Sequence, residues 1–217
     1  MLIEEIMHRR VHTAGPDTTL KQALQLLQEH RIRHLPVTDG DRLVGIVTDR
    51  DLREACPSIL EKNPQDDTLE QPVSSIMKRE VITAHPLDFI EDAARLMYEH
   101  RIGCLPVLQE ERLVGIVTQT DVLHTLIELF GVDRPSQRVE IEVPDRAGML
   151  ADAARVFRQH KANLLSVIMH PGTRENTRRI VFRAETMLID DIVRELRAAG
   201  HRVLWPPVED QEPEGSK

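Results

Sequence analysis

The amino-acid sequence predicts an α/β (α+β) protein built from two copies of one small unit and a third, different domain. First, residues 30–51 return as residues 100–121, in register and without a gap. Second, each copy alternates hydrophobic patterns of helical and extended period. Third, the region after residue 137 alternates strand and helix patterns in another order. These patterns favour one domain made of the two copies and a second, different domain, and they argue against a long repeat array.

The repeat has a long period and extends upstream of its most similar part. Ile6-Met7 and Thr13-Ala14 recur as Ile76-Met77 and Thr83-Ala84. A solenoid needs three or more stacked repeats, so two long copies favour two units packed about a pseudo-twofold axis. Clefts between such units commonly bind ligands, and we expect a ligand site there.

Each copy begins with a short helical segment, residues 3–7 in the first copy, and an extended piece that ends in Thr-Ala. Apolar residues at helical spacing between residues 20 and 27 predict an amphipathic helix. Two strands, residues 35–38 and 42–48, flank the turn sequence Asp39-Gly40-Asp41. A second helix is predicted to begin after Thr48, and the second copy repeats this order.

A different element order begins near Gln137. The predicted elements follow as βαββαβ, the order of a ferredoxin-like fold. Gly200 favours the end of the last helix, because glycine readily takes the left-handed conformation found there. The strands are predicted at residues 138–143, 163–170, 177–185 and 201–205, and the helices at 149–160 and 188–199.

Composition marks the connections between these parts. Several prolines between residues 57 and 72 predict a loop. Residues near the C-terminal end are rich in proline, glutamate and other polar types, so we expect a disordered tail. The predicted boundaries are 1–66 for the first copy, 67–130 for the second, 131–137 for a linker, 138–207 for the C-terminal domain and 208–217 for the tail.

Composition also excludes several classes of function. The net charge of −8 argues against nucleic-acid binding, which needs a basic face. Cys56 and Cys104 form no CxxC motif, which fits a reducing cytosol without a structural disulfide. The sequence shows no signal-peptide pattern and no apolar run of the ~18 residues that span a bilayer. We therefore expect a cytoplasmic protein with no membrane partner.

Both copies end their second strand with Gly-x-x-Thr-x-x-Asp, which contains Thr48 and Asp51 in the first copy and Thr118 and Asp121 in the second. Thr-x-x-Asp fits a capping box, in which each side chain bonds to the other residue's backbone N–H. A helix N-terminus with a hydroxyl group also suits a phosphate, and a carboxylate there can accept ribose hydroxyls. The spacing alone leaves both interpretations open.

The preceding strand contains Pro36 in the first copy and Pro106 in the second. Proline cannot donate a hydrogen bond to a sheet, so its presence predicts an edge strand. We expect an unpaired edge that presents backbone groups to a base.

These residues resemble the motifs of the CBS (cystathionine-β-synthase) family, and residues 1–130 resemble a CBS pair, or Bateman module. The resemblance implies a regulatory adenosine nucleotide (AMP, ADP or ATP) or S-adenosylmethionine in the cleft, with no catalytic cofactor. It also implies that Asp51 and Asp121 hold ribose hydroxyls, and that Thr48 and Thr118 contact phosphate. Further contacts are implied for Thr13, Ala14, Thr83 and Ala84 on the first strands, and for His34, Leu35, Pro36, Cys104, Leu105 and Pro106 around the base.

The copies diverge at positions near this ligand. Arg33-His34 becomes Gly103-Cys104, and Asp49-Arg50 becomes Gln119-Thr120. We therefore expect two unequal sites.

The turn between Val143 and Leu150, followed by a helix, resembles that of an ACT domain covering residues 138–205. A tight turn with a glycine explains the same residues without a ligand, and both interpretations stay open. The resemblance implies an amino-acid site that includes Asp145, Ala147, Gly148, Met149, Leu150 and Asn163.

The remaining polar residues suggest no catalytic site. The ten histidines show no spacing typical of metal ligands, and no nucleophile or phosphate-loop motif is present. Basic clusters at residues 155–161 and 174–183 are expected to be solvated surface. We therefore predict no metal site and no enzyme activity.

A CBS pair followed by an ACT domain resembles the small bacterial regulatory proteins of the acetoin-utilisation (AcuB) family. This resemblance implies a non-catalytic regulator of acetoin or butanediol catabolism that pairs as a homodimer through both domains and controls another enzyme. Two alternatives are a partner-binding module with vestigial clefts and an enzyme with an unrecognised site. The sequence leaves open which adenosyl ligand binds, which copy holds it and which target is controlled.

Overall fold

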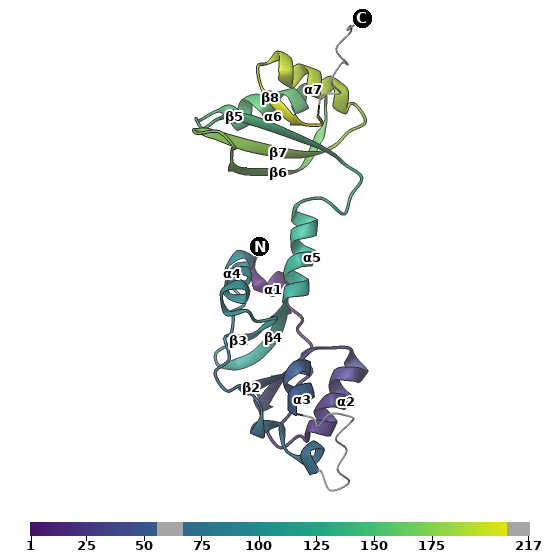
Figure 1. The fold of residues 1–217 in the computed structure, drawn as a ribbon, viewed down its shortest axis with the longest axis vertical. Coiled ribbons are helices and arrows are strands. Elements are labelled where there is room, and N and C mark those ends of the chain that lie inside the picture. Colours follow the sequence, from purple (N-terminus) through teal and green to yellow (C-terminus); the bar gives the residue numbers. More distant parts are fainter. Residues whose placement is uncertain (56–66, 208–217) are drawn as a thin grey trace, which may run out of the picture. The chain divides into compact units, whose positions relative to one another are not determined.

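The structure is a computed structural model that describes residues 1–55 and 67–207. The chain divides into two compact units, Met1–His124 and Thr125–Lys217. Each unit contains a four-stranded antiparallel sheet with helices, which confirms the predicted mixed fold class (Figure 1). Cys56, most of the predicted loop at 57–72 and the predicted disordered tail lie outside the described residues.

The first unit contains the two copies as similar sets of elements. The first copy consists of α1 (Ile3–Ile6), α2 (Leu20–His30), β1 (His34–Asp39), β2 (Arg42–Thr48) and α3 (Asp49–Ala55). The second copy consists of η2 (Asp67–Glu70), η3 (Val73–Ser75), α4 (Ile90–His100), β3 (Cys104–Gln109), β4 (Arg112–Thr118) and the start of α5 (Gln119–Leu129), a helix that runs across the boundary between the two units.

Local sequence explains the position of α2. Thr19 accepts a hydrogen bond from the Gln22 backbone, and the Gln22 side chain accepts one from the Thr19 backbone, so a capping box starts the helix. The apolar face buries Leu20 and Leu27 in the core of the first copy. The helix ends where Arg31 adopts a left-handed conformation with φ of 52°.

The sheet of this unit has the order β1-β2-β4-β3, with the two hairpins joined at the Arg42–Arg112 pair. Two further bridges link the copies reciprocally. His8 pairs with Ile116, and the residues at the equivalent positions of the repeat, Lys78 and Ile46, pair in the same way. This reciprocity confirms the predicted pseudo-twofold packing.

The first segment of each copy packs on the other copy. Ile3 donates its backbone N–H to Asp88, while Val73 donates to Thr18 in the same relative position. Val73 and Met77 are accordingly part of the core cluster around α2, which belongs to the first copy. Each copy therefore lends its first segment to its neighbour.

Two glycines make this exchange possible. A Cβ atom at Gly45 would lie 2.6 Å from the sulfur of Met77, and one at Gly115 would lie 2.6 Å from the sulfur of Met7. Such distances are too short for packed atoms. The glycine of the repeated Leu-Val-Gly-Ile-Val strand thus provides space for a methionine of the other copy.

The expected unpaired edge at the prolines is wrong. The carbonyl of Pro36 accepts a hydrogen bond from the Ala14 backbone at 3.0 Å, and Thr38 donates to the Ala14 carbonyl at 2.9 Å. Ala84 and Pro106 repeat this pairing at 3.0 Å. The extended Thr-Ala segment therefore pairs with the edge at both prolines, and the base contacts expected of Leu35, Pro36, Leu105 and Pro106 stay predictions.

The second unit confirms the predicted βαββαβ order, and its sheet has the order β6-β7-β5-β8. Inward-facing side chains of β5 and β7 form one core with both helices, so α6 and α7 cover the same face of the sheet. Phe157 and Phe182 pack at the centre, with ring centroids 4.6 Å apart. The elements are β5 (Gln137–Pro144), α6 (Met149–Gln159), β6 (Asn163–Pro171), β7 (Thr177–Glu185), α7 (Ile189–Ala198) and β8 (Arg202–Trp205).

The opposite face of this sheet buries two carboxylates of β5, Glu140 and Glu142. Glu142 receives hydrogen bonds from Thr173 and from Arg202 at 2.6 Å. Burial raises the pKa of Glu142, but the Thr173 and Arg202 hydrogen bonds outweigh it and lower this pKa to about 2. Arg179 pairs with Glu140 at 2.9 Å, so the basic cluster at 174–183 is only partly solvated surface.

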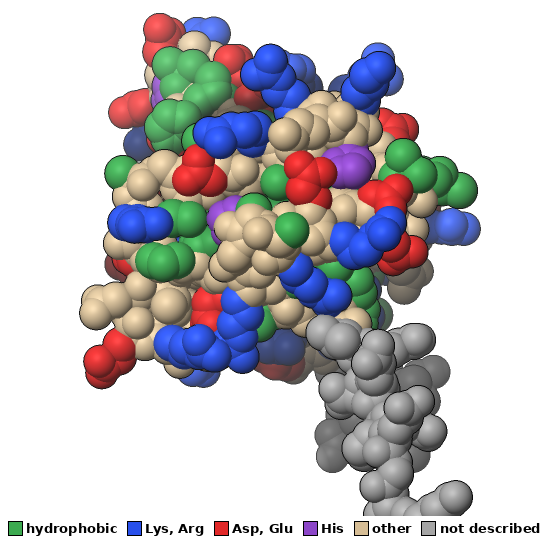
Figure 2. Space-filling view, turned by 90° about the horizontal axis from the view of Figure 1, so that it is seen from above, with side chains coloured by type: hydrophobic (Ala, Val, Ile, Leu, Met, Phe, Trp, Pro, Cys, Tyr) green, Lys and Arg blue, Asp and Glu red, His purple; other side chains and the backbone are tan. Residues whose placement is uncertain are grey.

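Charges elsewhere are dispersed. On the face shown in Figure 2, Lys and Arg side chains stand in several separate places with Asp and Glu side chains between them. Among the described helices, none is both long and apolar enough to cross a bilayer.

Candidate functional site

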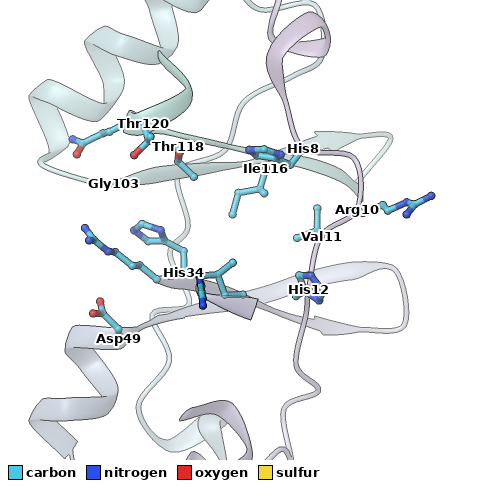
Figure 3. A pocket seen from close by; sticks show the side chains of 14 residues that line it. His8, Arg10, Val11, His12, His34, Asp49, Gly103, Ile116, Thr118 and Thr120 are labelled. Atoms are coloured by element: carbon cyan, nitrogen blue, oxygen red, sulfur yellow. The ribbon is translucent and has the colours of Figure 1, made fainter. Parts of the chain in front are cut away.

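Two cavities of the unit Met1–His124 lie where its two copies meet. The larger, of about 620 Å³, is named the Asp121 cavity because it includes Thr118 and His8, the residue that binds Asp121 (Figure 3). The smaller, of about 330 Å³, is named the Asp51 cavity because Asp51 lines it. The Asp121 cavity is lined by residues 8, 10–12, 31–34, 49, 103, 116 and 118–120, and the Asp51 cavity by residues 34, 46, 48–51, 78, 80–82 and 101–104.

The two cavities are equivalent positions of the repeat. Nearly every lining residue of one has its repeat equivalent in the lining of the other. Each cavity joins the Thr-x-x-Asp end of one copy to the first segment of the other copy. Thr118 thus faces His8 and Val11, while Thr48 faces Lys78 and Val81. A ligand in either cavity would contact both copies.

The Thr-x-x-Asp sequences form capping boxes in both copies. Asp51 donates its backbone N–H to the Thr48 hydroxyl at 3.2 Å, and Thr48 donates its own N–H to Asp51 Oδ2 at 2.9 Å. The same bonds in the second copy, between Asp121 and Thr118, measure 3.3 and 2.8 Å. The capping interpretation is therefore correct, and it uses Oδ2 of each carboxylate.

The other oxygen of each aspartate points to a basic residue of the other copy. Asp121 Oδ1 lies 2.9 Å from His8 Nε2, and Asp51 Oδ1 lies 3.7 Å from Lys78 Nζ. His8 and Lys78 occupy equivalent positions of the repeat. Capping does not exclude ligand binding, because Oδ2 of each aspartate takes part in the cap and Oδ1 points to the other copy.

The structure brings some of the predicted ligand contacts together and separates others. Thr48, Asp51, His34 and Cys104 line the Asp51 cavity, and Thr118 and His34 line the Asp121 cavity. The remaining predicted contacts line neither cavity, and most are buried in the sheet. These are Thr13, Ala14, Leu35, Pro36, Thr83, Ala84, Leu105, Pro106 and Asp121, of which Asp121 contacts the Asp121 cavity through the lining residue His8.

Several lining residues were missed from the sequence, among them His8, Arg10, Lys78 and Glu80. The sequence does carry a sign of this lining. The repeat extends to Val11 and Val81, two residues before the repeated Thr-Ala pairs, and both valines line the cavities. Sequence reasoning stopped at Thr-Ala, which covers the sheet edge, whereas the residues immediately before it face the cavity.

Two titratable groups of the cavities have shifted pKa values. Burial lowers the pKa of His34, and the nearby Asp49 carboxylate opposes this shift in part. Burial raises the pKa of the Cys104 thiol to about 12, so this thiol stays protonated and unreactive at neutral pH. His12, in the Asp121 cavity, stacks on His30 with ring centroids 3.6 Å apart.

The predicted amino-acid site of the second unit surrounds the start of α6. Gly148 precedes this helix with φ of 92°, a conformation that favours glycine. Asp145 forms an ion pair with Arg178 at 2.9 Å, and Asn163 donates to Glu185 at 3.4 Å. Ala147 and Leu150 are exposed and Met149 is buried, and their role in binding an amino acid stays a prediction. Within the described ranges, no group of three or more His, Cys, Asp or Glu residues could hold a metal ion.

Comparison with protein families identifies both units. The model of the CBS domain matches residues 3–58 and 73–128. The chain belongs to the CBS domain family. The model of the ACT domain matches residues 137–201, so a CBS pair is followed by an ACT domain.

Three solved CBS structures are similar to this chain. The CBS pair of protein MJ0100, in complex with 5′-methylthioadenosine and S-adenosyl-L-methionine, is 32% identical with a TM-score of 0.51 and covers 62% of this chain and 98% of its own. A Vibrio cholerae structure that carries the name acetoin utilization protein (AcuB) is 32% identical with a TM-score of 0.53, covering 63% and 98%. CBSX2 in complex with AMP is 29% identical with a TM-score of 0.52, covering 61% and 98%.

Proposed function

We propose that this CBS–ACT protein is a non-catalytic regulator that senses an adenosine nucleotide (AMP, ADP or ATP) or S-adenosylmethionine in its CBS cavities. One observation carries the proposal: each cavity is shared by the two copies, with Thr118 opposite His8 and Thr48 opposite Lys78. A ligand held by both copies has a different affinity for each arrangement of the pair, and this difference is what shifts a conformational equilibrium.

The chemistry of the cavities suits an adenosine ligand. Thr118 stands at the N-terminus of α5, where free N–H groups and the helix dipole favour a phosphate. Asp121 and Asp51 each use one carboxylate oxygen for capping. The other oxygen can accept hydrogen bonds from ribose hydroxyls, which would replace its contact with His8 or Lys78. Volumes of about 620 and 330 Å³ lie in the usual range for small-molecule sites.

The similar structures support the same ligand class. Protein MJ0100 holds 5′-methylthioadenosine and S-adenosyl-L-methionine, and CBSX2 holds AMP. All three ligands contain adenosine, and they differ in the group on the 5′ carbon. We propose that this chain recognises the shared adenosine.

Calorimetry on the full chain with AMP, ADP, ATP and S-adenosylmethionine tests the proposal. We expect binding of at least one ligand, and a loss of about tenfold or more in affinity in Asp51→Asn or Asp121→Asn. Asparagine suits these positions because it keeps an acceptor oxygen for the cap. Asp88→Asn is the matched control. The Asp88 carboxylate accepts a hydrogen bond of 2.7 Å from the His85 backbone N–H, and Asp88 lines neither cavity.

Absence of heat with all four ligands would refute the proposal. In that case, an unchanged melting temperature with every ligand would favour the partner-binding module with vestigial clefts. Turnover of acetoin by the purified protein would instead favour an enzyme.

We further propose that the ACT domain transmits the signal to a target enzyme of acetoin or butanediol catabolism. The support is the order of the two domains and the similarity to the Vibrio cholerae protein. Deletion of the gene should slow growth on acetoin as sole carbon source and leave growth on glucose unchanged. Equal growth of both strains on acetoin would contradict this pathway.

We also propose a homodimer in the cytoplasm. Large apolar side chains are exposed at the start of α4 (Phe89), on α4 (Tyr98) and on α5 (Leu123), and a second copy would cover such a surface. Light scattering should give twice the mass of the chain, and Leu123→Glu should return it to the monomer. A monomeric mass for the unmodified protein would contradict this assembly.

A further inference from the structure

The two CBS cavities differ in charge, and we infer from this that they take different classes of adenosine ligand. The Asp121 cavity takes a nucleotide with two or three phosphates, and the Asp51 cavity takes an adenosine ligand with one phosphate or none. The inference rests on the proposed function, and it adds which cavity takes which ligand.

Three arginines line the Asp121 cavity: Arg10, Arg31 and Arg33. None of them forms an ion pair with another residue in the described part of the chain. The acidic residue of the lining is Asp49, which also lines the Asp51 cavity and is paired with Arg53 at 3.2 Å. Asp121, which binds the lining residue His8 at 2.9 Å, adds a second carboxylate, so three arginines stand against two carboxylates. Unpaired guanidinium groups attract phosphate and bind it through paired hydrogen bonds.

The Asp51 cavity balances its charges. Its basic residues are Arg50, Lys78 and Arg101, and its acidic residues are Asp49, Asp51 and Glu80. Lys78 is already engaged by Asp51 at 3.7 Å. A ligand with three or four negative charges would therefore meet carboxylates as well as cations.

Two positions of the repeat account for much of the contrast. Arg10 becomes Glu80, which reverses the charge, and Arg33 becomes Gly103, which removes it. Two changes run the other way: His8 becomes Lys78, which is engaged by Asp51, and Thr120 corresponds to Arg50, which adds a cation beside the carboxylates of the Asp51 cavity.

The ends of the cavities where phosphate is expected differ in the same sense. In the Asp121 cavity, Thr118 is followed by the neutral Gln119 and Thr120 at the start of α5. Figure 3 shows Thr118 and Thr120 together at one end and Arg10 at the other, with Asp49 across from Thr120. Arg10 therefore adds to the positive charge of the cavity as a whole and does not stand beside Thr118. In the Asp51 cavity, the corresponding helix α3 starts with Asp49, which is paired with Arg53 and stands where α5 has the neutral Gln119 at the positive end of the helix. The larger volume of the Asp121 cavity also leaves space for a longer phosphate chain.

The test compares ATP with 5′-methylthioadenosine, which carries no phosphate, by calorimetry on the full chain. Asp121→Asn should weaken ATP about tenfold or more and leave 5′-methylthioadenosine nearly unchanged, whereas Asp51→Asn should do the reverse. Arg33→Gln should weaken ATP to a similar degree. The matched variant Arg101→Gln, in the other cavity, should leave ATP affinity unchanged.

The outcomes separate this inference from the proposed function. If ATP depends on Asp51 rather than Asp121, or if both ligands depend equally on one aspartate, the inference is wrong and the proposed function stands. If neither ligand binds, while AMP and S-adenosylmethionine also give no heat, the proposed function itself fails. A circular dichroism spectrum identical to that of the unmodified protein is required of each variant.

Discussion

The imidazole of His34 lies against Gly103, so closely that a Cβ atom at Gly103 would stand 2.7 Å from His34 Nε2. His34 lines both cavities and forms part of the wall between them. The repeat is broken at this contact, because position 103 aligns with Arg33 and position 104 with His34. The second copy has Gly103 where the first has Arg33, and the absence of a side chain at Gly103 gives space to His34 of the first copy.

This contact predicts coupling between substitutions at the two positions. Gly103→Ala should displace the imidazole and weaken ligand binding in both cavities, because His34 contributes to both. In the background His34→Ala the same substitution should have little effect. A double-mutant cycle in the free energy of unfolding should therefore show a coupling of about 1 kcal/mol. Additive effects of the two substitutions would contradict the contact.

The lowered pKa of His34 predicts a dependence of stability on acidic pH. Burial favours the neutral ring in the folded protein, so the unfolded chain binds more protons below its own pKa of about 6.5. The free energy of unfolding should consequently fall as the pH drops below about 6.5. Asp49, Arg33 and Asp51 face this ring and are unchanged in the variant His34→Gln, which should show a shallower dependence between pH 6.5 and 5. Parallel curves for the two proteins would refute this assignment.

The ACT domain should respond to stronger acid through Glu142. Its pKa of about 2 in the folded protein lies below the ordinary value of 4.5, so its contribution is complete above pH 4.5 and is lost as the pH falls toward 2. Denaturation curves at several pH values should show a smaller loss of stability over this window in Glu142→Gln. Glu175, which is exposed, provides the control, and Glu175→Gln should follow the unmodified protein.

The glycines of the repeated strand should not tolerate alanine. In Gly45→Ala the new methyl group would meet Met77 and the carbonyl of Lys78, at 2.6 and 3.1 Å. We expect a loss of about 1–3 kcal/mol in the free energy of unfolding, as for other overpacked cores. Gly15→Ala is a suitable comparison, because its nearest contact would be Thr18 at an ordinary 3.8 Å. Equal stability of the two variants would contradict the close packing of the copies.

The elements and the pseudo-twofold relation could be predicted from the sequence because they depend on local patterns and on the repeat itself. The buried face of α2 follows from leucine spacing, and the capping boxes at Thr48 and Thr118 follow from residues close together in the chain. Such features are decided by near neighbours in the sequence.

The composition of the cavities could not be predicted in the same way. It depends on how one copy packs on the other, which brings His8 to Asp121 from the opposite end of the CBS pair. The error at Pro36 has a related cause, since the strand lies at a sheet edge but the earlier segment around Ala14 covers it. Glu142 shows the converse case, in which a polar residue of a strand is buried because residues from other segments satisfy its charge.

The exchange of first segments, in which residues 1–8 complete the second copy and residues 71–78 complete the first, makes the CBS pair equivalent to a domain-swapped dimer fused into one chain. The unit that repeats in the sequence is therefore not the unit that folds. A fragment with one copy alone would lack its own closing segment, and it would gain one only by association with a second fragment. The tandem arrangement supplies that partner at a fixed, high local concentration, so the two cavities form together or not at all.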